Sequence, residues 1–306
     1  MYPVGFLFVT NFFDYINQPN SNAHYIWRMT AESMQGNIGE LKLVQVETLE
    51  YPSDYLDRVV KVDIYLPKPF QSSSRISLLF VNDGQDLPRM PFTSILEKLY
   101  HEKAIEPLIV VGIHCSPDRK LEYGTADMLD FMNRGARAKY HRKFLMQELI
   151  PSILGKYNLS GVHEMAYAGF SLGGLAALDV AWKYPKIFSK AGIFSGSLWW
   201  RLRDLDDDYN EDTDRVMHKL IREGQYHKGL KFFFQTGNLD EKMDRNNNGI
   251  IDSIDDTLGL IKELEAKGYD REEDIHYLEL ADGRHDVPTW GRAFPDFLKW
   301  GWGKKK

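Results

Sequence analysis

The segment from Ala166 to Ala177 reads AYAGFSLGGLAA, and it restricts the possible folds more than any other part of the chain. A short apolar run is followed by a serine between glycines, Ser171, and then by the apolar start of a helix. A serine in such a sharp turn between strand and helix has a strained backbone, and its neighbours must be small for the turn to close. The turn lifts the hydroxyl clear of the sheet. The sequence therefore predicts Ser171 as a nucleophile.

Around this segment the chain alternates between apolar runs and amphipathic segments. Runs such as ISLLFV are apolar nearly throughout, which is typical of strands buried on both faces of a parallel sheet. We expect strands of this kind at 76–81 and 108–113, and further strands at 165–168, 191–195, 230–235 and 275–280. The helices that we expect are 93–103, 138–154 with a kink at Pro151, 172–184, 214–223, 257–267 and 288–300. This order predicts an α/β fold with a mostly parallel central sheet and helices on both faces.

The N-terminal part of the chain has a different pattern. Residues 1–38 are rich in Asn, Gln, Tyr and Phe without clear periodicity, so we expect an irregular leader on the surface. From residue 39 the alternation of apolar and polar residues predicts two half-buried antiparallel strands, 41–47 with a β-bulge and 60–66. A turn around 52–54 would join them. We therefore expect a leader at 1–38 and a single α/β domain at 39–303.

Charge and cysteine content exclude several classes of partner. The 306 residues include 38 Lys and Arg against 44 Asp and Glu, a net charge of -6, so the sequence predicts neither a nucleic-acid partner nor an anionic membrane partner. The single cysteine, Cys115, excludes an internal disulfide.

The N-terminal apolar run GFLFVT is too short to span a bilayer and has no basic residue before it, as a signal peptide would. We expect a cytoplasmic protein, although a processed secreted protein would have the same pattern.

A nucleophilic serine needs a base and an acid. In α/β hydrolases the three groups follow the chain order serine, acid, histidine, each at the carboxyl end of a strand. Of the four histidines after Ser171, only His285 lies between the last predicted strand and the last predicted helix, so it is our candidate base. Asp240 and Glu241 follow the strand at 230–235. We favour Asp240, because the shorter side chain nearer the strand is held more rigidly, and Glu241 is the alternative acid.

The negative charge that develops on the substrate oxygen needs two backbone N–H groups. One comes from the residue after the nucleophile, Leu172, and the other from an early loop. The loop at 82–85, Asn-Asp-Gly-Gln, follows a buried strand, and its Gly84 permits a close backbone approach. We therefore expect the N–H groups of Gln85 and Leu172 to form the oxyanion hole.

Several motifs in order resemble one family. They are FVNDGQD, the stretch from Asp118-Arg119 to Glu122-Tyr123-Gly124, FLMQELIP, YAGFSLGGLAAL, FSGSLWW and GRHDVPTW. Together they cover about residues 40–302 and resemble the esterase family that includes enterochelin esterase, esterase D and feruloyl esterases. The resemblance implies an α/β-hydrolase fold, a serine esterase and the triad Ser171, Asp240 or Glu241, and His285. The SGSLWW segment looks most like the siderophore-esterase branch.

A second motif follows the predicted acid. Residues 244–255 read DRNNNGIIDSID, with oxygen ligands at the spacing of an EF-hand calcium loop and Gly249 at the sharp turn. The predicted ligands are Asp244, Asn246, Asn248, the Ile250 carbonyl, Asp252 and Asp255. Asp255 stands where a bidentate Glu is usual, which should loosen or reshape the site. We expect a structural Ca²⁺ that orders the neighbouring acid loop, and a helix-capping turn is the alternative.

Aromatic residues near these elements are candidates for contact with a small-molecule ester substrate. Trp199, Trp200 and Trp290 lie just beyond predicted catalytic elements, where an acyl or aromatic group would stack, although a place in the core accounts for them equally well. Arg119 and Tyr123 follow a strand end and would line the pocket. An ion pair between Arg119 and Glu122 that locks the loop is the alternative.

The residues support three functions that differ in what the serine does. The first is hydrolysis of a carboxylic ester, on siderophore-type or aromatic acyl groups, without a catalytic cofactor. The second is acyl transfer by the same triad to an acceptor alcohol. The third is a non-catalytic, calcium-stabilised binding protein on the hydrolase scaffold. Neither the substrate nor the oligomeric state follows from the sequence.

Overall fold

The computed structural model describes residues 28–29, 43–70, 76–159 and 161–304. Their strands form one sheet with the order β1-β2-β3-β5-β4-β6-β7-β8-β9. The strands are β1 (Arg28–Met29), β2 (Val44–Ser53), β3 (Arg58–Pro67), β4 (Ile76–Asn82), β5 (Leu108–Ile113), β6 (Val162–Phe170), β7 (Phe188–Phe194), β8 (Lys231–Leu239) and β9 (Ile275–Arg284). The pairs from β5 to β9 are parallel, and those of β1, β2 and β3 are antiparallel. The predicted α/β-hydrolase fold is therefore confirmed.

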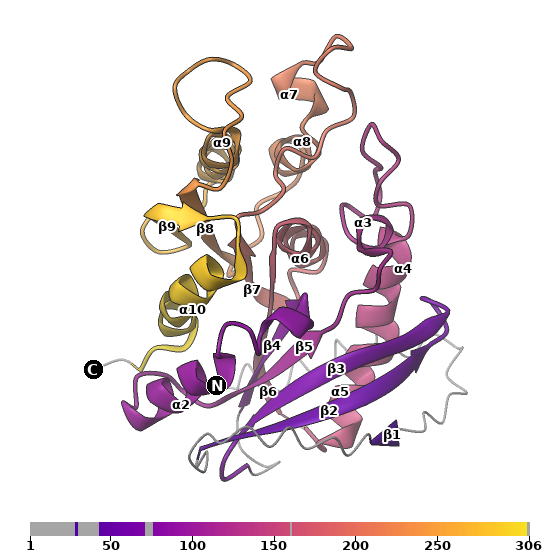
Figure 1. The fold of residues 1–306 in the computed structure, drawn as a ribbon, viewed down its shortest axis with the longest axis vertical. Coiled ribbons are helices and arrows are strands. Elements are labelled where there is room, and N and C mark those ends of the chain that lie inside the picture. Colours follow the sequence, from indigo (N-terminus) through magenta and orange to yellow (C-terminus); the bar gives the residue numbers. More distant parts are fainter. Residues whose placement is uncertain (1–27, 30–42, 71–75, 160, 305–306) are drawn as a thin grey trace.

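Helices cover both faces of this sheet (Figure 1). They are α2 (Phe92–His101), α3 (Arg119–Glu122), α4 (Ala138–Lys143), α5 (Ile150–Lys156), α6 (Leu172–Lys183), α7 (Glu211–Asp214), α8 (Val216–Glu223), α9 (Asp252–Lys267) and α10 (Val287–Trp302). Successive residues of β4 alternate between two cores. Leu78 and Phe80 pack with α5, α6, α8 and α9, whereas Leu79 and Val81 pack with α2 and α10. This alternation explains why the strand is apolar at every position.

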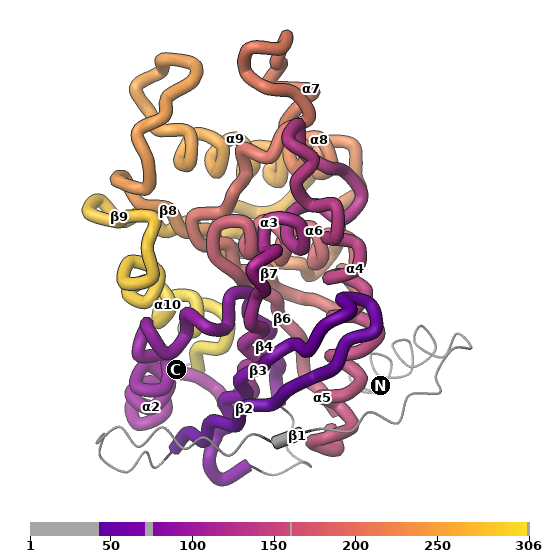
Figure 2. Tube along the Cα trace, turned by 45° about the vertical axis from the view of Figure 1, so that its right-hand side comes forward, coloured from indigo at the N-terminus to yellow at the C-terminus, as the bar shows by residue number. Residues whose placement is uncertain are grey.

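The parallel strands bring the predicted functional loops to one edge of the sheet. The carboxyl ends of β4, β6, β8 and β9 lead into the loop at 82–85, Ser171, Asp240 and His285 respectively. At the same end of the molecule, Figures 1 and 2 show the loop between β8 and α9 beside the segment that carries α7. Helices α8 and α9 below these two segments pack against each other.

Several boundaries differ from the sequence prediction. The turn between β2 and β3 lies at 54–57 rather than 52–54, because both strands pair in continuous register up to Ser53 and Arg58. The predicted helix at 138–154 is interrupted by a π-helical segment, Phe144–Leu149, just before Pro151. The predicted leader, apart from β1, and the first residues of the predicted strand at 41–47 lie outside the described residues. Among the described helices, none is long and apolar enough to cross a membrane.

Candidate active site

Ser171 occupies a strained turn between β6 and α6. Its backbone has φ 55 and ψ -122, a conformation that a residue with a side chain rarely adopts. The turn closes because Gly169 lies against Gly173: a Cβ on Gly169 would lie 2.4 Å from the Gly173 carbonyl carbon. The Ser171 N–H donates to the Phe194 carbonyl at 2.9 Å, which ties the turn to the end of β7. The serine hydroxyl is therefore presented at the edge of the sheet by a rigid backbone.

A second serine lies next to the first. The hydroxyl oxygens of Ser171 and Ser197 are 3.3 Å apart, and the Ser197 N–H donates to the Ser171 carbonyl at 3.1 Å. Within the described residues, no hydrogen bond joins Ser171 to His285 in this conformation. The sequence analysis did not single out Ser197, although it lies in the SGSLWW segment directly after β7.

Asp240 and Glu241 point toward different parts of the molecule. The Asp240 Oδ2 accepts the Gly237 N–H at 3.1 Å, and among described residues its buried Oδ1 has no hydrogen-bond partner. Burial raises the pKa of Asp240, and the nearby His285 and the Ser195 hydroxyl lower it. Glu241 instead responds to groups at the start of α9: burial and the charge of Asp252 raise its pKa, and the Ser253 backbone lowers it. This arrangement places Asp240, and not Glu241, in the field of the histidine.

His285 follows β9 directly and stands edge-on to the ring of Trp290, with 5.4 Å between the ring centroids. The surrounding protein partly desolvates the imidazole and lowers its pKa, while the charge of Asp240 acts in the opposite direction. The positive charge of Arg119 lowers the pKa further. The residue still has solvent access, so the ring can receive and release a proton at the surface of the site.

A buried tryptophan supports the acid rather than a substrate. The Trp290 Nε1–H donates to the Ser195 hydroxyl at 3.0 Å, and Ser195 in turn lies beside the Asp240 carboxylate. The Trp290 side chain also stacks on Phe170, the residue before the nucleophile, at 5.0 Å between centroids. Trp290 is only 7% exposed. Its predicted role as a substrate contact is therefore replaced by packing between the acid, the base and the serine turn.

The loop that follows β4 lies close to β5. A Cβ on Gly84 would lie 2.3 Å from the carbonyl carbon of Gly112, so only glycine fits there. The Gln85 side chain is used internally: its Oε1 accepts the Cys115 N–H at 3.1 Å and its Nε2 contacts the Cys115 sulfur at 3.2 Å. The backbone N–H groups of Gln85 and Leu172 have no acceptor among the described residues. Both predicted oxyanion donors therefore remain available to a ligand.

Two further residues predicted to face the substrate are packing residues. Trp200 is fully buried, with Gly124 and Gly135 against its ring, and its Nε1–H donates to the Met128 carbonyl at 3.3 Å. Tyr123 is also fully buried, and its hydroxyl accepts the Asp83 N–H at 3.2 Å. The sequence could place these residues near strand ends, but not decide on which side of the backbone they point.

Arg119 and Trp199 keep part of their surface exposed. The alternative of an ion pair between Arg119 and Glu122 is not found. The Arg119 guanidinium pairs with Asp83, and Glu122 pairs with Arg58. Trp199 is half-buried, and the Arg134 guanidinium lies over its ring at 4.7 Å from the centroid. Of these three tryptophans, Trp199 is the one that is only half-buried.

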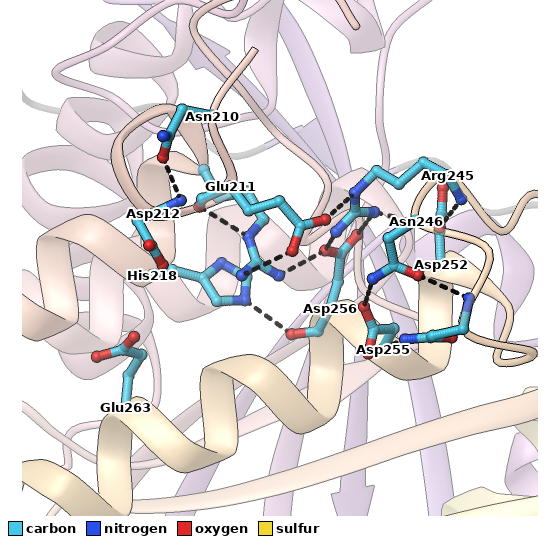
Figure 3. Close-up of polar contacts among 12 residues, drawn as sticks. Asn210, Glu211, Asp212, His218, Arg245, Asn246, Asp252, Asp255, Asp256 and Glu263 are labelled. Carbon is cyan, nitrogen blue, oxygen red and sulfur yellow. Dashed lines mark hydrogen bonds and ion pairs between the residues drawn. The ribbon is translucent and has the colours of Figure 1, made fainter.

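The predicted calcium loop is folded as a compact turn (Figure 3). The Asp244 carboxylate accepts the N–H groups of Asn248 and Gly249 at 3.0 and 2.9 Å, and Gly249 has φ +83. The side-chain amides of Asn246 and Asn248 donate to the two oxygens of Asp255 at 3.0 and 3.2 Å. The side-chain oxygens of Asn246 and Asn248 accept the backbone N–H groups of Asn248 and Ile250 at 3.2 and 2.8 Å. In the described chain, no group of three or more His, Cys, Asp and Glu side chains is placed to hold a metal.

The remaining predicted ligands lie differently. Asp252 faces Arg245, whose backbone N–H it accepts at 2.9 Å, and the Ile250 side chain is exposed. Arg245 also pairs with Asp256 and, at 2.8 Å, with Glu211 (Figure 3). This arginine therefore ties the loop to α9 and to α7.

Comparison with known proteins agrees with this architecture. A family model described as "Putative esterase" matches residues 53–300. The uncharacterized protein YbbA of Bacillus subtilis (strain 168) is 23% identical over 251 residues, which cover 79% of this chain and 92% of that protein.

Solved structures share the fold at low sequence identity. An enterobactin esterase from Shigella flexneri has a TM-score of 0.64 at 19% identity, and the aligned part covers 84% of this chain but only 58% of that one. A ferulic acid esterase has a TM-score of 0.63 at 16% identity over 85% of this chain and 98% of that one. A siderophore hydrolase from Aspergillus nidulans has a TM-score of 0.60 at 17% identity over 83% and 95%. The chain therefore belongs to the "Putative esterase" family, a family of carboxylic ester hydrolases with the α/β-hydrolase fold.

Proposed function

We propose that this chain hydrolyses carboxylic esters through an acyl-enzyme on Ser171. The observation that carries the proposal is the strained serine turn, together with the N–H groups of Leu172 and Gln85, which have no acceptor among the described residues. Such a pair of donors, held rigidly, stabilises the negative charge of a tetrahedral intermediate better than water does. Family membership and the order of the loops agree with this chemistry.

The reaction would follow the chemistry of a serine triad. His285 removes the proton as the Ser171 hydroxyl attacks the ester carbonyl, and the Gln85 and Leu172 N–H groups bind the oxyanion. His285 then returns the proton to the leaving alcohol, and water repeats the steps to release the acid. We expect the buried Asp240 Oδ1, which has no hydrogen-bond partner among the described residues, to accept an N–H from the imidazolium. Closure of the triad requires the Ser171 hydroxyl to donate to His285, and the Ser171 oxygen can still accept from the Ser197 hydroxyl.

The acyl group would be aromatic or of the siderophore type. Trp199 lies two residues beyond Ser197, which contacts the nucleophile, and the Arg134 guanidinium lies over its ring. The half-buried indole offers a partly exposed surface on which an aromatic acyl group can stack, and the Arg134 guanidinium is already paired with the buried Asp130 carboxylate. The enterobactin, ferulic acid and siderophore esterases that share the fold support this choice.

Ester hydrolysis can be tested directly. Nitrophenyl esters of increasing acyl length, a feruloyl ester and a trilactone siderophore would be assayed with the wild type and with Ser171→Ala. We expect turnover that Ser171→Ala abolishes, and hydrolysis by that variant would refute the assignment. Asp240→Asn and Glu241→Gln form a matched pair of acid variants. We expect only Asp240→Asn to reduce kcat, by about 10⁴-fold as when a triad acid loses its charge.

Product analysis distinguishes hydrolysis from acyl transfer. With an alcohol acceptor present, a hydrolase still releases mainly the free acid, whereas a transferase releases mainly the new ester. A chain that binds the esters without turnover would instead be the binding protein of the third hypothesis.

We also propose that the loop at 244–255 binds Ca²⁺ as a structural ion. The side chains of Asp244, Asn246, Asn248 and Asp255 supply the hard oxygen donors that this ion prefers, and they lie together in the structure. A bound cation would replace the amide contacts to Asp255. Because the loop starts four residues after Asp240, its order would limit the motion of the acid.

Titration calorimetry tests the ion site. The chelator-stripped protein should bind Ca²⁺ and show a higher melting temperature with it, because an ion that binds only the folded chain stabilises that chain. Asp244→Ala should remove both effects, whereas Asp270→Ala, in an exposed turn elsewhere, should not. A stripped wild type without a calorimetric signal would refute the site.

A further inference from the structure

We propose that Arg119 is a positioning residue that holds the two donors of the oxyanion hole at a fixed separation. This inference rests on the proposed ester hydrolysis and deepens it. The Arg119 Nε and Nη2 donate to the two oxygens of Asp83, each at 2.7 Å, and Nη2 also donates to the Phe170 carbonyl at 3.0 Å. Asp83 lies two residues before Gln85, and Phe170 lies two residues before Leu172. One guanidinium therefore joins the loops that carry both N–H donors.

The Asp83 end of this bridge is held on every side. The residue has a left-handed backbone with φ 59, a conformation that is uncommon for residues with a side chain and that aspartate tolerates better than most. Its N–H donates to the buried Tyr123 hydroxyl, and its carboxylate lies so close to Gly173 that a Cβ there would be 2.6 Å from Oδ2. The side chain of Asp83 is 3% exposed. The Asp83 carboxylate is thus held between the Arg119 guanidinium and the start of α6.

This geometry argues against Arg119 as a contact for the substrate. Its bidentate pair with Asp83 and its third bond to Phe170 already use most of its donors. The face of the guanidinium lies over the Tyr123 ring at 5.1 Å from the centroid. A planar fork of this kind fits one carboxylate and cannot be reproduced by lysine.

Arg119 also affects the base through its charge. Its positive charge lowers the pKa of His285, in addition to the effect of partial desolvation. The groups that act on His285 are Asp240 and Asp286, which raise the pKa, and Arg119, which lowers it. A neutral variant should therefore have a base with a higher pKa, whereas a lysine at the same place should retain most of the field.

Two variants separate the geometric role from the charge. Arg119→Met removes both the fork and the charge, and Arg119→Lys removes only the fork. With a soluble nitrophenyl ester, both variants should lower kcat by about 10- to 100-fold. This decrease is no larger than the decrease in kcat when one oxyanion donor is removed. KM should stay within about twofold of the wild-type value. The acidic limb of the kcat/KM profile should move to higher pH in Arg119→Met and stay near the wild type in Arg119→Lys.

The Arg58–Glu122 pair provides a matched control. Arg58 also makes a bidentate pair, with Nε and Nη2 at 2.9 and 2.7 Å from the Glu122 carboxylate, but it contacts neither donor loop. Arg58→Met and Arg58→Lys should lower the melting temperature as the Arg119 variants do, while kcat stays unchanged. If Arg119→Met does not fold, the comparison of Arg119→Lys with Arg58→Lys decides the question.

Three outcomes would overturn the proposal, and they can be told apart. An Arg119→Met enzyme with wild-type kcat shows that the bridge is not needed. A rise in KM alone shows that Arg119 binds the substrate. A wild type that hydrolyses no ester, with no difference from Ser171→Ala, shows that the proposed function itself is wrong, and the role of Arg119 fails with it.

Discussion

Replacing Gly173 by alanine should disturb the active site without any change in the catalytic groups. A Cβ at this position would lie 2.6 Å from the Asp83 Oδ2 and 2.9 Å from the Asn82 Cβ. Neither atom can easily withdraw, because Arg119 holds both oxygens of Asp83 and the Asn82 side chain donates to the Gly173 carbonyl at 2.9 Å. The added methyl must therefore push the loop that carries Gln85 away from α6.

Gly155 is the matched control, since it also lies in a helix and a Cβ there meets nothing within 4 Å. Alanine should stabilise the chain by about 0.5–1 kcal/mol at Gly155, through the lower entropy of its unfolded state. At Gly173 the same gain is offset by an overpacking cost of about 1–3 kcal/mol. The two variants should therefore differ by about 1–3 kcal/mol in unfolding free energy.

Thermal unfolding and steady-state kinetics measure the two effects. At about 2 °C per kcal/mol for a chain of this size, Gly173→Ala should melt about 2–6 °C below Gly155→Ala. Its kcat should fall at least about tenfold, because a displacement of less than 1 Å already affects an oxyanion donor. If both variants had the same melting temperature and wild-type kcat, the contact of Asp83 with α6 would not be rigid and the reasoning would be refuted.

Three further predictions concern other groups. The base must be neutral to accept a proton, and the pKa of His285 is lowered from 6.5, so the acidic limb of kcat/KM should lie below pH 6.5; a midpoint above it would contradict the assignment. Burial raises the pKa of Asp179 to about 6, so unfolding free energy should fall as pH rises from about 4 to about 6. Asp179→Asn should remove this dependence of the unfolding free energy on pH and stabilise the chain at pH 7 by at most about 3 kcal/mol. The same pH dependence in denaturant titrations of the variant and the wild type would refute the role of Asp179. Trp290→Phe should lose the bond to Ser195, reducing stability by about 1 kcal/mol and lowering kcat at constant KM, whereas Trp182→Phe, in the other core, should leave kcat unchanged.

Much of the fold follows from local sequence patterns. The apolar runs, the helical spacing and the serine turn each depend on neighbours a few residues apart, so they predicted the parallel part of the sheet and the helices on its two faces. The π-helical segment at Phe144–Leu149 could not be predicted in this way. Its one-residue offset depends on how the helix packs on the sheet, and the spacing of apolar residues is nearly the same with and without it.

In the candidate site, the sequence predicted where the loops lie but not where each side chain points. Position at a strand end identified the loops of Ser171, Asp240 and His285, because the carboxyl ends of parallel strands meet at one edge. The same argument placed Trp200 and Tyr123 in the pocket, but both are buried in the core. A strand end fixes the position of a loop, whereas the direction of each side chain depends on loop dihedrals that the sequence pattern does not contain.

Some residues near the candidate site connect its loops to one another, a role that the sequence pattern did not predict. Arg119 bridges the loops after β4 and β6, while Trp290 links α10 to the ends of β6 and β7. Each loop alone would have several conformations, and a catalytic geometry needs all of them fixed together to within a fraction of an ångström. Aromatic rings and the arginine guanidinium suit this task because they are planar and rigid groups that can also form hydrogen bonds, which are also the properties that favour them as ligand contacts. Residue type at a strand end therefore cannot distinguish a residue that holds loops together from one that contacts the ligand. Burial can: the side chains of Tyr123 and Trp200 are 0% exposed.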